Sequence, residues 1–157
     1  GSRQPAWVGA AFDDYASRMP ADWAVTLKEI KPESRSLGRT VAQMLAAEAL
    51  RIRQAIPPRA TVVALDERGE RKTSEALSQY LTDSQQDTQD LAFLIGGADG
   101  LCETLRAQAH AMLRLSDMTL PHGMVRVILA EQLYRAWSIA VGHPYHRSWA
   151  RASNERR

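Results

Sequence analysis

Two glycines follow directly after an apolar run of the sequence, at a position where a parallel sheet can bind a ligand. Gly96 and Gly97 come after residues 91–95 (LAFLI), and two other apolar runs end at Leu65 and at Leu115. In an open parallel sheet, ligands bind at the carboxyl ends of the strands, where backbone N–H groups are exposed. Glycine lets the backbone approach a ligand closely, although a Gly-Gly pair is equally typical of a tight turn. The segment lacks the G-x-G-x-x-G spacing, so a nicotinamide-dependent enzyme is disfavoured.

A second group of chemically capable side chains lies near the C-terminus. Tyr145, His146 and Arg147 are adjacent and offer an aromatic ring, a titratable imidazole and a cation that can grip phosphate. His143 and His146 form an H-x-x-H pair, but no further Cys or His lies close enough in sequence to complete a zinc site. We therefore favour a polar or RNA-contacting role over metal binding. Pro144 restricts the residue before it to extended backbone, so this tail should leave the preceding helix and lie across a neighbouring surface.

Two other features have structural interpretations beside the functional ones. Glu131 and Arg135 have the i, i+4 spacing of a plain intrahelical ion pair. Cys102 is the only cysteine and has no His nearby in sequence, so we expect a small structural thiol. A single cysteine cannot form an internal disulfide, which fits a reducing, cytoplasmic compartment.

Arginine dominates the positive charge of this 157-residue chain. Of 20 basic residues 17 are Arg, at a formal net charge of only +2. Arginine suits phosphate recognition, but a GC-rich genome encodes arginine by default, so composition indicates RNA as a partner without establishing it. The longest stretch without Asp, Glu, Lys or Arg is residues 136–146, much shorter than the roughly 20 apolar residues of a membrane span. No secretory signal is expected either.

Helical and strand patterns alternate along the chain. We expect one domain with an α/β fold, in which helices cover both faces of a mostly parallel sheet. The helices are expected over residues 5–19, 40–56, 73–81, 101–112 and 123–141, the strands over 23–28, 61–66, 91–95 and 113–116, and a polar loop over 31–39.

The last expected helix is apolar almost all round. Its polar residues form a narrow stripe of Glu131, Arg135 and Ser138. A helix with so little polar surface is buried on more than one side, and in a small protein the second covering surface can belong to another subunit.

Several motifs in the C-terminal half occur in a fixed order. They are residues 94–100 (LIGGADG), 115–122 (LSDMTLPH), 125–127 (VRV), 131–137 (EQLYRAW) and 143–147 (HPYHR), with matching residues at 1–3, 5, 7–8, 65–66 and 69. Together they resemble the small SPOUT-superfamily methyltransferases that modify N3 of a pseudouridine in 23S ribosomal RNA of the large subunit. The resemblance covers nearly the whole chain.

The resemblance implies S-adenosylmethionine as methyl donor, a homodimer formed through the C-terminal helix, and a trefoil knot over about residues 91–141. Such knots are rare among protein folds. The cofactor-binding residues implied in this way are Leu65, Gly96, Gly97, Leu115, Ser116, Asp117, Met118, Thr119 and Leu120. The implied RNA-binding residues are His122, Arg126 and His143, and the implied catalytic residues are Arg135, Tyr145, His146 and Arg147.

The role of each catalytic candidate stays open at this point. The reaction needs an in-line attack by N3 and removal of the imide proton. His146 is a candidate base, while Arg147 or Arg135 can stabilise the developing imide anion. The alternative function is a non-catalytic RNA-binding or ribosome-associated dimer with the same fold. The cofactor segments favour the enzyme, because a pure binding protein needs no glycine turn facing a pocket.

The ends of the chain depart from the family pattern. Members of the family begin with an apolar strand before the motif that starts here at Gly1, and this chain lacks that strand. We expect residues 1–147 to form the single methyltransferase domain. Residues 148–157 (SWARASNERR) form a basic extension that we expect to be flexible.

Overall fold

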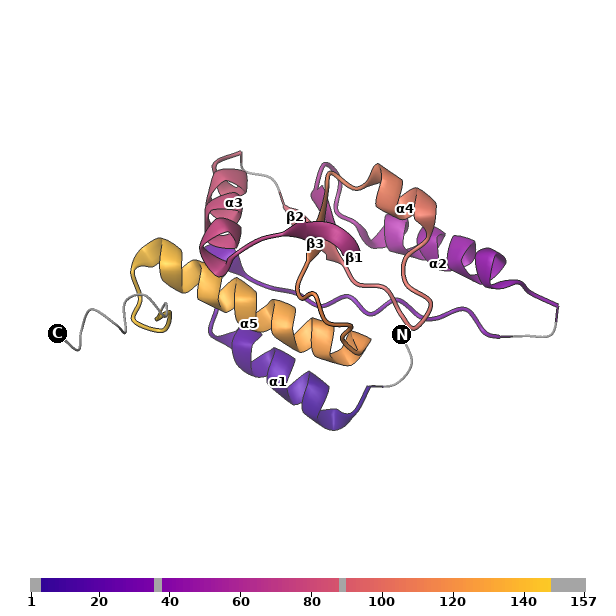
Figure 1. Cartoon of the computed structure of the whole chain (residues 1–157), viewed down its shortest axis with the longest axis horizontal. Coiled ribbons are helices and arrows are strands. Elements are labelled where there is room, and N and C mark those ends of the chain that lie inside the picture. Colours follow the sequence, from indigo (N-terminus) through magenta and orange to yellow (C-terminus); the bar gives the residue numbers. More distant parts are fainter. Residues whose placement is uncertain (1–3, 36–37, 88–89, 148–157) are drawn as a thin grey trace.

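The computed structural model describes residues 4–35, 38–87 and 90–147 (Figure 1). The N-terminal residues 1–3 and the predicted flexible extension 148–157 lie outside the described residues. In chain order the elements are α1 (Ala6–Ser17), the 3-10 helix η1 (Ala21–Trp23), α2 (Val41–Ala55), β1 (Thr61–Arg71), α3 (Ser74–Gln86), β2 (Leu91–Leu94), α4 (Glu103–Gln108), β3 (Ala111–Arg114) and α5 (His122–Val141). The order of these elements is that of an α/β protein.

The three strands form one parallel sheet in the order β2-β1-β3. Successive residues of a strand point to opposite faces, and Val63 and Ala64 of the central strand accordingly belong to two different buried clusters. The first cluster contains residues of α3 and α5, and the second contains residues of α2 and α4. Helices therefore cover both faces of a parallel sheet, as the sequence predicts (Figure 1).

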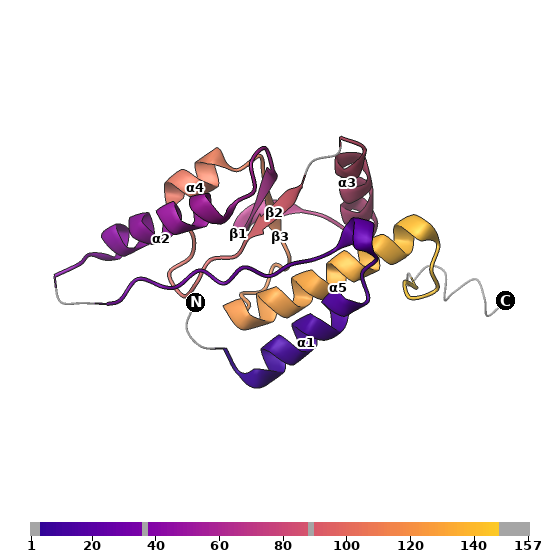
Figure 2. The ribbon, with the colours of Figure 1, turned by 180° about the vertical axis from the view of Figure 1, so that it is seen from behind.

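Helix α5 is buried mainly by its own chain. Its residues Leu129 and Leu133 belong to the cluster beneath the sheet, together with Leu77 and Leu81 of α3. Helix α1 runs beside it in both Figure 1 and Figure 2. The two helices approach so closely that a Cβ on Gly123 would lie 3.3 Å from Val8. Helices α1 and α3 thus supply much of the second covering surface that the all-round apolar pattern requires.

A buried hydrogen bond joins α3 to α5. The hydroxyl of Ser78, which is 3% exposed, donates to the backbone carbonyl of Ala136 over 2.7 Å. The carbonyl belongs to a residue with no exposed surface. This bond fixes the two helices against each other close to the C-terminal half of α5.

One predicted strand is wrong. Residues 21–23 form the 3-10 helix η1, and residues 24–32 have no regular structure and pair with no strand of the described chain. Trp23 and Val25 nevertheless pack partly buried against the first cluster. Their alternation reflects side-chain burial along an extended segment, without the backbone ladder that defines a strand.

Two boundaries near the sheet also differ from the prediction. Helix α4 ends at Gln108, and β3 begins at Ala111, two residues before the expected start. The reason is His110, whose backbone N–H donates to the Val62 carbonyl while its Nδ1 accepts from the Val62 N–H, each over 2.9 Å. These two bonds attach the chain to β1 before residue 111 and so end the helix early.

Strand β1 is longer than the predicted 61–66. It continues to Arg71, with an irregularity between Leu65 and Glu70, where both residues pair with Leu113. The chain bulges out over the intervening residues and returns to β3. Gly69 lies so close to β3 that a Cβ there would be 2.6 Å from the carbonyl carbon of Leu113.

In the described ranges, no helix is long and apolar enough to cross a membrane.

Candidate active site

The carboxyl ends of β2 and β3 lie at one edge of the sheet, level with Leu65 of β1, and we call this the carboxyl edge. Leu65 in β1, Ile95 after β2 and Leu115 after β3 are half-buried, and all three pack against the same buried cluster. The predicted cofactor segments therefore start from one edge, because the strands are parallel. The edge offers apolar side chains together with the backbone of the loops that follow.

The two glycines after β2 differ in the space beside them: Gly96 has no room for a side chain, whereas Gly97 has. A Cβ on Gly96 would lie 2.6 Å from the carbonyl carbon of Gly100, whose φ of +77° is left-handed and whose N–H donates to the Gly97 carbonyl over 3.0 Å. The turn itself therefore requires glycine at 96. At Gly97, a Cβ would meet no atom of the described chain within 4 Å. Position 97 leaves space beside the backbone, as a ligand would need.

The segment after β3 is held at Asp117. Its carboxylate accepts from Arg71 Nε over 2.9 Å and from Arg114 Nη1 over 3.1 Å. The hydroxyl of Ser116 accepts from the Met118 N–H over 2.9 Å, and the Met118 side chain is 79% exposed. Arg114 Nε is buried without a hydrogen-bond partner among the described residues. The guanidinium of Arg114 thus has one unsatisfied N–H inside the described part of the fold, next to the segment that starts at Leu115.

The second predicted region begins where α5 ends. Gly142 has a left-handed φ of +73°, and the N–H groups of Gly142 and His143 donate to the carbonyls of Ile139 and Ser138. This is the glycine-ended C-cap that reverses a chain after a helix. The tail then packs back on α5, where the Tyr145 ring lies edge-on to Tyr134 with the ring centroids 4.7 Å apart. The tail leaves the helix as predicted, but Tyr145 and His146 fold back onto α5 itself, with one further contact from His146 to Glu75 of α3.

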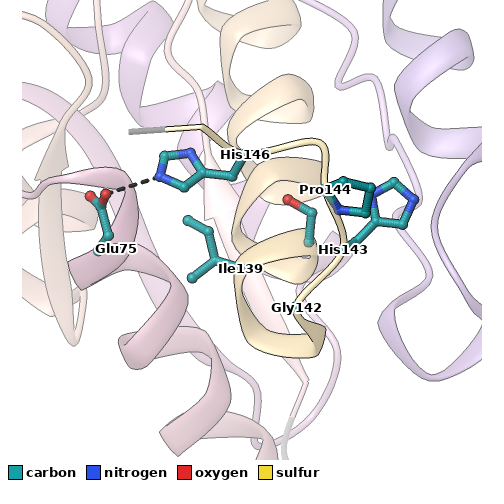
Figure 3. Close-up of a pocket in the computed structure, with 7 residues that line it drawn as sticks. Glu75, Ile139, Gly142, His143, Pro144 and His146 are labelled. Atoms are coloured by element: carbon teal, nitrogen blue, oxygen red, sulfur yellow. Dashed lines mark hydrogen bonds and ion pairs between the residues drawn. The ribbon is translucent and has the colours of Figure 1, made fainter. Parts of the chain in front are cut away.

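Five side chains form what we call the tail network: Glu75, Glu131, Arg135, Tyr145 and His146. Glu131 Oε1 accepts from Arg135 Nε at 2.9 Å, from Arg135 Nη2 at 2.6 Å and from the Tyr145 hydroxyl at 3.0 Å. Arg135 Nη1 lies 3.1 Å from His146 Nδ1. His146 Nε2 lies 3.0 Å from Glu75 Oε1 (Figure 3). The i, i+4 ion pair that the sequence predicts is thus the centre of a larger network.

Burial and charge fix the protonation of several members. Burial raises the pKa of Tyr145 far above its ordinary value, and hydrogen bonds with Tyr15 and Glu131 raise it further. Burial by itself lowers the pKa of Arg135, but the hydrogen bond and charge of Glu131 raise it above its ordinary value. The pKa of Glu75 is lowered by a hydrogen bond from its own backbone N–H and by the contact with His146. Tyr145 is therefore a hydrogen-bond donor at working pH, and Arg135 is a cation.

A cavity of about 350 Å³ opens beside the network (Figure 3). Its lining residues are Glu75, Ser138, Ile139, Gly142, His143, Pro144 and His146. Glu75 and His146 face each other at one side, and His143 and Pro144 lie at the other. None of the predicted cofactor residues lines this cavity. The tail region and the carboxyl edge are therefore two separate candidate regions of one chain.

The predicted RNA-binding residues do not come together. His122 is the first residue of α5, whereas His143 follows its end, and 20 helical residues span about 30 Å. Arg126 is largely buried and donates to Glu29 Oε1 over 2.9 Å. His143 Nδ1 accepts from the Tyr145 N–H, and its ring lies 5.6 Å from that of Trp137. Within one chain these residues form two separate groups.

The predicted H-x-x-H pair does not converge, because the nitrogens of His146 face Arg135 and Glu75. Arg147 is exposed. Cys102 is half-buried at the N-terminus of α4, where a hydrogen bond with Thr104 lowers the pKa of the thiol. Sequence reasoning missed Glu75, since it lies 71 residues from His146 and its position in the first turn of α3 carries no signal of that contact.

Comparison with known proteins adds to this geometry. A family model described as "Predicted SPOUT methyltransferase" matches residues 1–146. A protein of Bordetella pertussis is 58% identical over 148 residues, which cover 94% of this chain and 95% of the relative. One of Burkholderia mallei is 55% identical over the same shares of both chains. Both relatives carry the name "Ribosomal RNA large subunit methyltransferase H".

Proposed function

The chain belongs to the SPOUT methyltransferase family, and from this premise we propose that it transfers a methyl group from S-adenosylmethionine to N3 of a pseudouridine in 23S ribosomal RNA. The relatives' name supports large-subunit ribosomal RNA as the substrate. The motif resemblance supports N3 of pseudouridine as the acceptor and a trefoil knot over about residues 91–141 of a domain spanning residues 1–147. Action on ribosomal RNA goes with a cytoplasmic location.

The observation that carries the proposal is the opening at Gly97 on the carboxyl edge. The half-buried side chains of Leu65, Ile95 and Leu115 suit the flat, apolar face of an adenine. These residues fit S-adenosylmethionine, and residues 116–120 follow Leu115 directly at the same edge. The cofactor supplies a methyl carbon on a positively charged sulfur, which leaves with the electron pair of the broken carbon–sulfur bond.

The protein must then orient N3 and receive its proton. The N3–H bond breaks, its electron pair forms the new bond to the methyl carbon, and the proton passes to a base. The base we assign is His146. Arg135 and Arg147 supply positive charge that stabilises the imide oxygen as charge develops. Tyr145 can stack on an extruded base, an interaction that typically contributes about 1–3 kcal/mol.

The distance between the two sites supports a homodimer. Arg135 lies 13 residues after His122, or about 20 Å along α5, whereas methyl transfer needs reacting atoms about 3 Å apart. Figure 1 places the segment that leads into α5 at one end of the helix and the tail at the other. A second copy with its α5 antiparallel to the first brings the tail of one chain to the carboxyl edge of its partner.

Subunit mixing tests this arrangement. A variant blocked at the carboxyl edge by a bulky ring (Gly97→Trp) and a variant impaired in the tail (His146→Ala) should each keep only a small fraction of the wild-type activity as pure proteins. In a mixture that has exchanged subunits, one site in roughly four combines two intact halves, so about a quarter of the wild-type activity should return. No recovery of activity in a mixture with proven exchange contradicts the shared site. A 17.5 kDa monomer in light scattering of the unmodified chain contradicts the dimer itself.

The activity is tested by calorimetry with S-adenosylmethionine, followed by methylation of 23S ribosomal RNA containing pseudouridine. We expect binding of the cofactor and methyl incorporation that is lost when uridine replaces the target pseudouridine. Cofactor binding without incorporation contradicts the assigned acceptor. The absence of heat at millimolar cofactor contradicts the enzyme and leaves the non-catalytic RNA-binding dimer as the better account.

A further inference from the structure

Glu75 reaches the tail network from a different helix. Its Oε1 lies 3.0 Å from Nε2 of His146, and the two side chains face each other at one side of the cavity (Figure 3). The side chain of His146 is 15% exposed, whereas that of Glu75 is 53% exposed. The imidazole is therefore enclosed, and the carboxylate approaches it from the solvent side.

The partners of the two ring nitrogens determine which nitrogen carries the proton. A guanidinium only donates hydrogen bonds and a carboxylate only accepts them. Arg135 Nη1 lies 3.1 Å from His146 Nδ1, so Nδ1 must accept. Glu75 Oε1 lies 3.0 Å from Nε2, so Nε2 must donate. In the opposite tautomer the Nδ1–H would face an N–H of Arg135, and the Nε2 lone pair would face the carboxylate of Glu75.

We propose that Glu75 is a positioning residue for methyl transfer: it holds His146 in the Nε2–H tautomer, whose Nδ1 lone pair is covered by Arg135 until Arg135 turns to the RNA. This inference rests on the proposed function, in which His146 receives the proton of N3. Without the contacts to Arg135 and Glu75, which we call the clamp, His146 could present either nitrogen to the substrate. The Nδ1 lone pair is the one beside Arg135, a cation that can turn to the imide oxygen or to a phosphate of the RNA.

Glu75 also stabilises the positive charge that His146 gains during the reaction. When Arg135 moves its N–H to the substrate, the Nδ1 lone pair becomes free at the same place. The proton of N3 then passes to Nδ1, while the electron pair of the broken N3–H bond forms the bond to the methyl carbon. The ring becomes an imidazolium that still donates from Nε2 to Glu75. A carboxylate that orients a histidine and stabilises its charged form plays the same part in the catalytic triad of serine proteases.

Ring-nitrogen spectroscopy tests the tautomer without any methylation assay. In protein labelled with 15N-histidine, long-range 1H–15N correlation spectra at alkaline pH show which nitrogen bears the proton, and His146→Gln identifies the signal. We expect Nε2–H in the wild type. Glu75→Gln should keep this tautomer, because its amide oxygen still accepts. In Glu75→Ala only Arg135 still favours Nε2–H, so the Nδ1–H form should become detectable as a minor species. A proton on Nδ1 in the wild type overturns the proposal.

Single-turnover methylation tests the positioning role. Glu75→Ala should slow methyl transfer about tenfold, the effect of losing roughly one hydrogen bond in the transition state, while cofactor affinity in calorimetry stays at the wild-type value. Glu75→Gln should keep the tautomer but still transfer methyl more slowly, because a neutral amide does not stabilise the imidazolium. The matched control is Glu103→Gln, which neutralises an exposed first-turn acid of α4 and should leave the rate unchanged.

A double-mutant cycle separates positioning from general stabilisation of the fold. In the His146→Gln background, Glu75→Ala should cause no further loss of rate, because the two residues act as one unit. An equal loss in both backgrounds overturns the proposal, and so does a Glu75→Ala variant with the wild-type tautomer and rate. If the wild type itself transfers no methyl group, the proposed function fails, and with it the catalytic role of Glu75, even where the spectra show Nε2–H.

Discussion

Substitution of Gly69 by alanine should disturb the cofactor edge through strand β3. A Cβ at this position would lie 2.6 Å from the carbonyl carbon of Leu113, 2.7 Å from its nitrogen and 2.8 Å from the carbonyl carbon of Met112. All three are backbone atoms, so no side-chain rotation relieves the contact. Ordinary contact begins at 3.4 Å, which requires the two strands to separate by about 0.8 Å.

The cost follows from the structure around β3. Over-filling a packed site usually costs about 1–3 kcal/mol. The separation also weakens the pairing of Glu70 with Leu113 and of Arg71 with Arg114, and the loss of one hydrogen bond there adds about 1 kcal/mol. We therefore expect the free energy of unfolding to fall by about 2–4 kcal/mol. For a chain of this length that corresponds to a decrease in Tm of about 5–15 °C.

Calorimetric unfolding measures the loss of stability, and titration with S-adenosylmethionine well below the Tm measures the effect on cofactor affinity. Because β3 leads directly into residues 115–120, its displacement should weaken cofactor binding as well as lower the Tm. Gly9→Ala is the control, since its Cβ would meet nothing within 4 Å on helix α1, and it should raise stability by roughly 0.5–1 kcal/mol. A Gly69→Ala variant that melts with the wild type would refute the argument from close approach. Lost stability with unchanged affinity would refute the link from β3 to the cofactor segment.

Gly97→Ala should melt no lower than the wild type, because its Cβ enters open space, yet bind S-adenosylmethionine about tenfold more weakly by calorimetry, since that space is assigned to the ligand. Ser78→Ala should lower the free energy of unfolding by about 1 kcal/mol in urea titrations, because it removes the buried bond to the Ala136 carbonyl. The raised pKa of Tyr145 stabilises the fold fully below the ordinary tyrosine value of about 10, and this contribution is lost as the pH rises above it. Urea titrations should therefore show the wild type losing stability above about pH 10 relative to Tyr145→Phe. Parallel pH profiles of these two proteins would contradict the raised pKa.

Local signals in the sequence predict most of the helices. Thr40 begins α2 with a capping box, in which its hydroxyl accepts from the Gln43 N–H and its own N–H donates to the Gln43 side chain. Thr73 caps α3 in the same way through its hydroxyl. Caps of this kind act over three residues, so the sequence contains everything that is needed to place them.

Contacts between distant segments limit the prediction of strands. The alternation at Trp23 and Val25 shows which side chains are buried, but a strand also needs a neighbour to pair with, and no local pattern reveals whether one is present. The early start of β3 depends on two hydrogen bonds between His110 and Val62, which are 48 residues apart. The contact of Glu75 with His146 also joins residues far apart in the chain, so no local pattern predicts it. The residue types of the tail indicate polar chemistry there, but they do not reveal the contact with Glu75 on α3.

The hydrogen bond between Ser78 and Ala136 has a consequence for motion. It lies about one helical turn from Glu75 on α3 and directly beside Arg135 on α5. The bond therefore joins the two helices close to the two side chains that contact the imidazole of His146. A movement of the two helices about this bond should therefore change the separation of Glu75 and Arg135 less than that of residues farther along the helices. The imidazole between them should keep both contacts when the helices shift slightly.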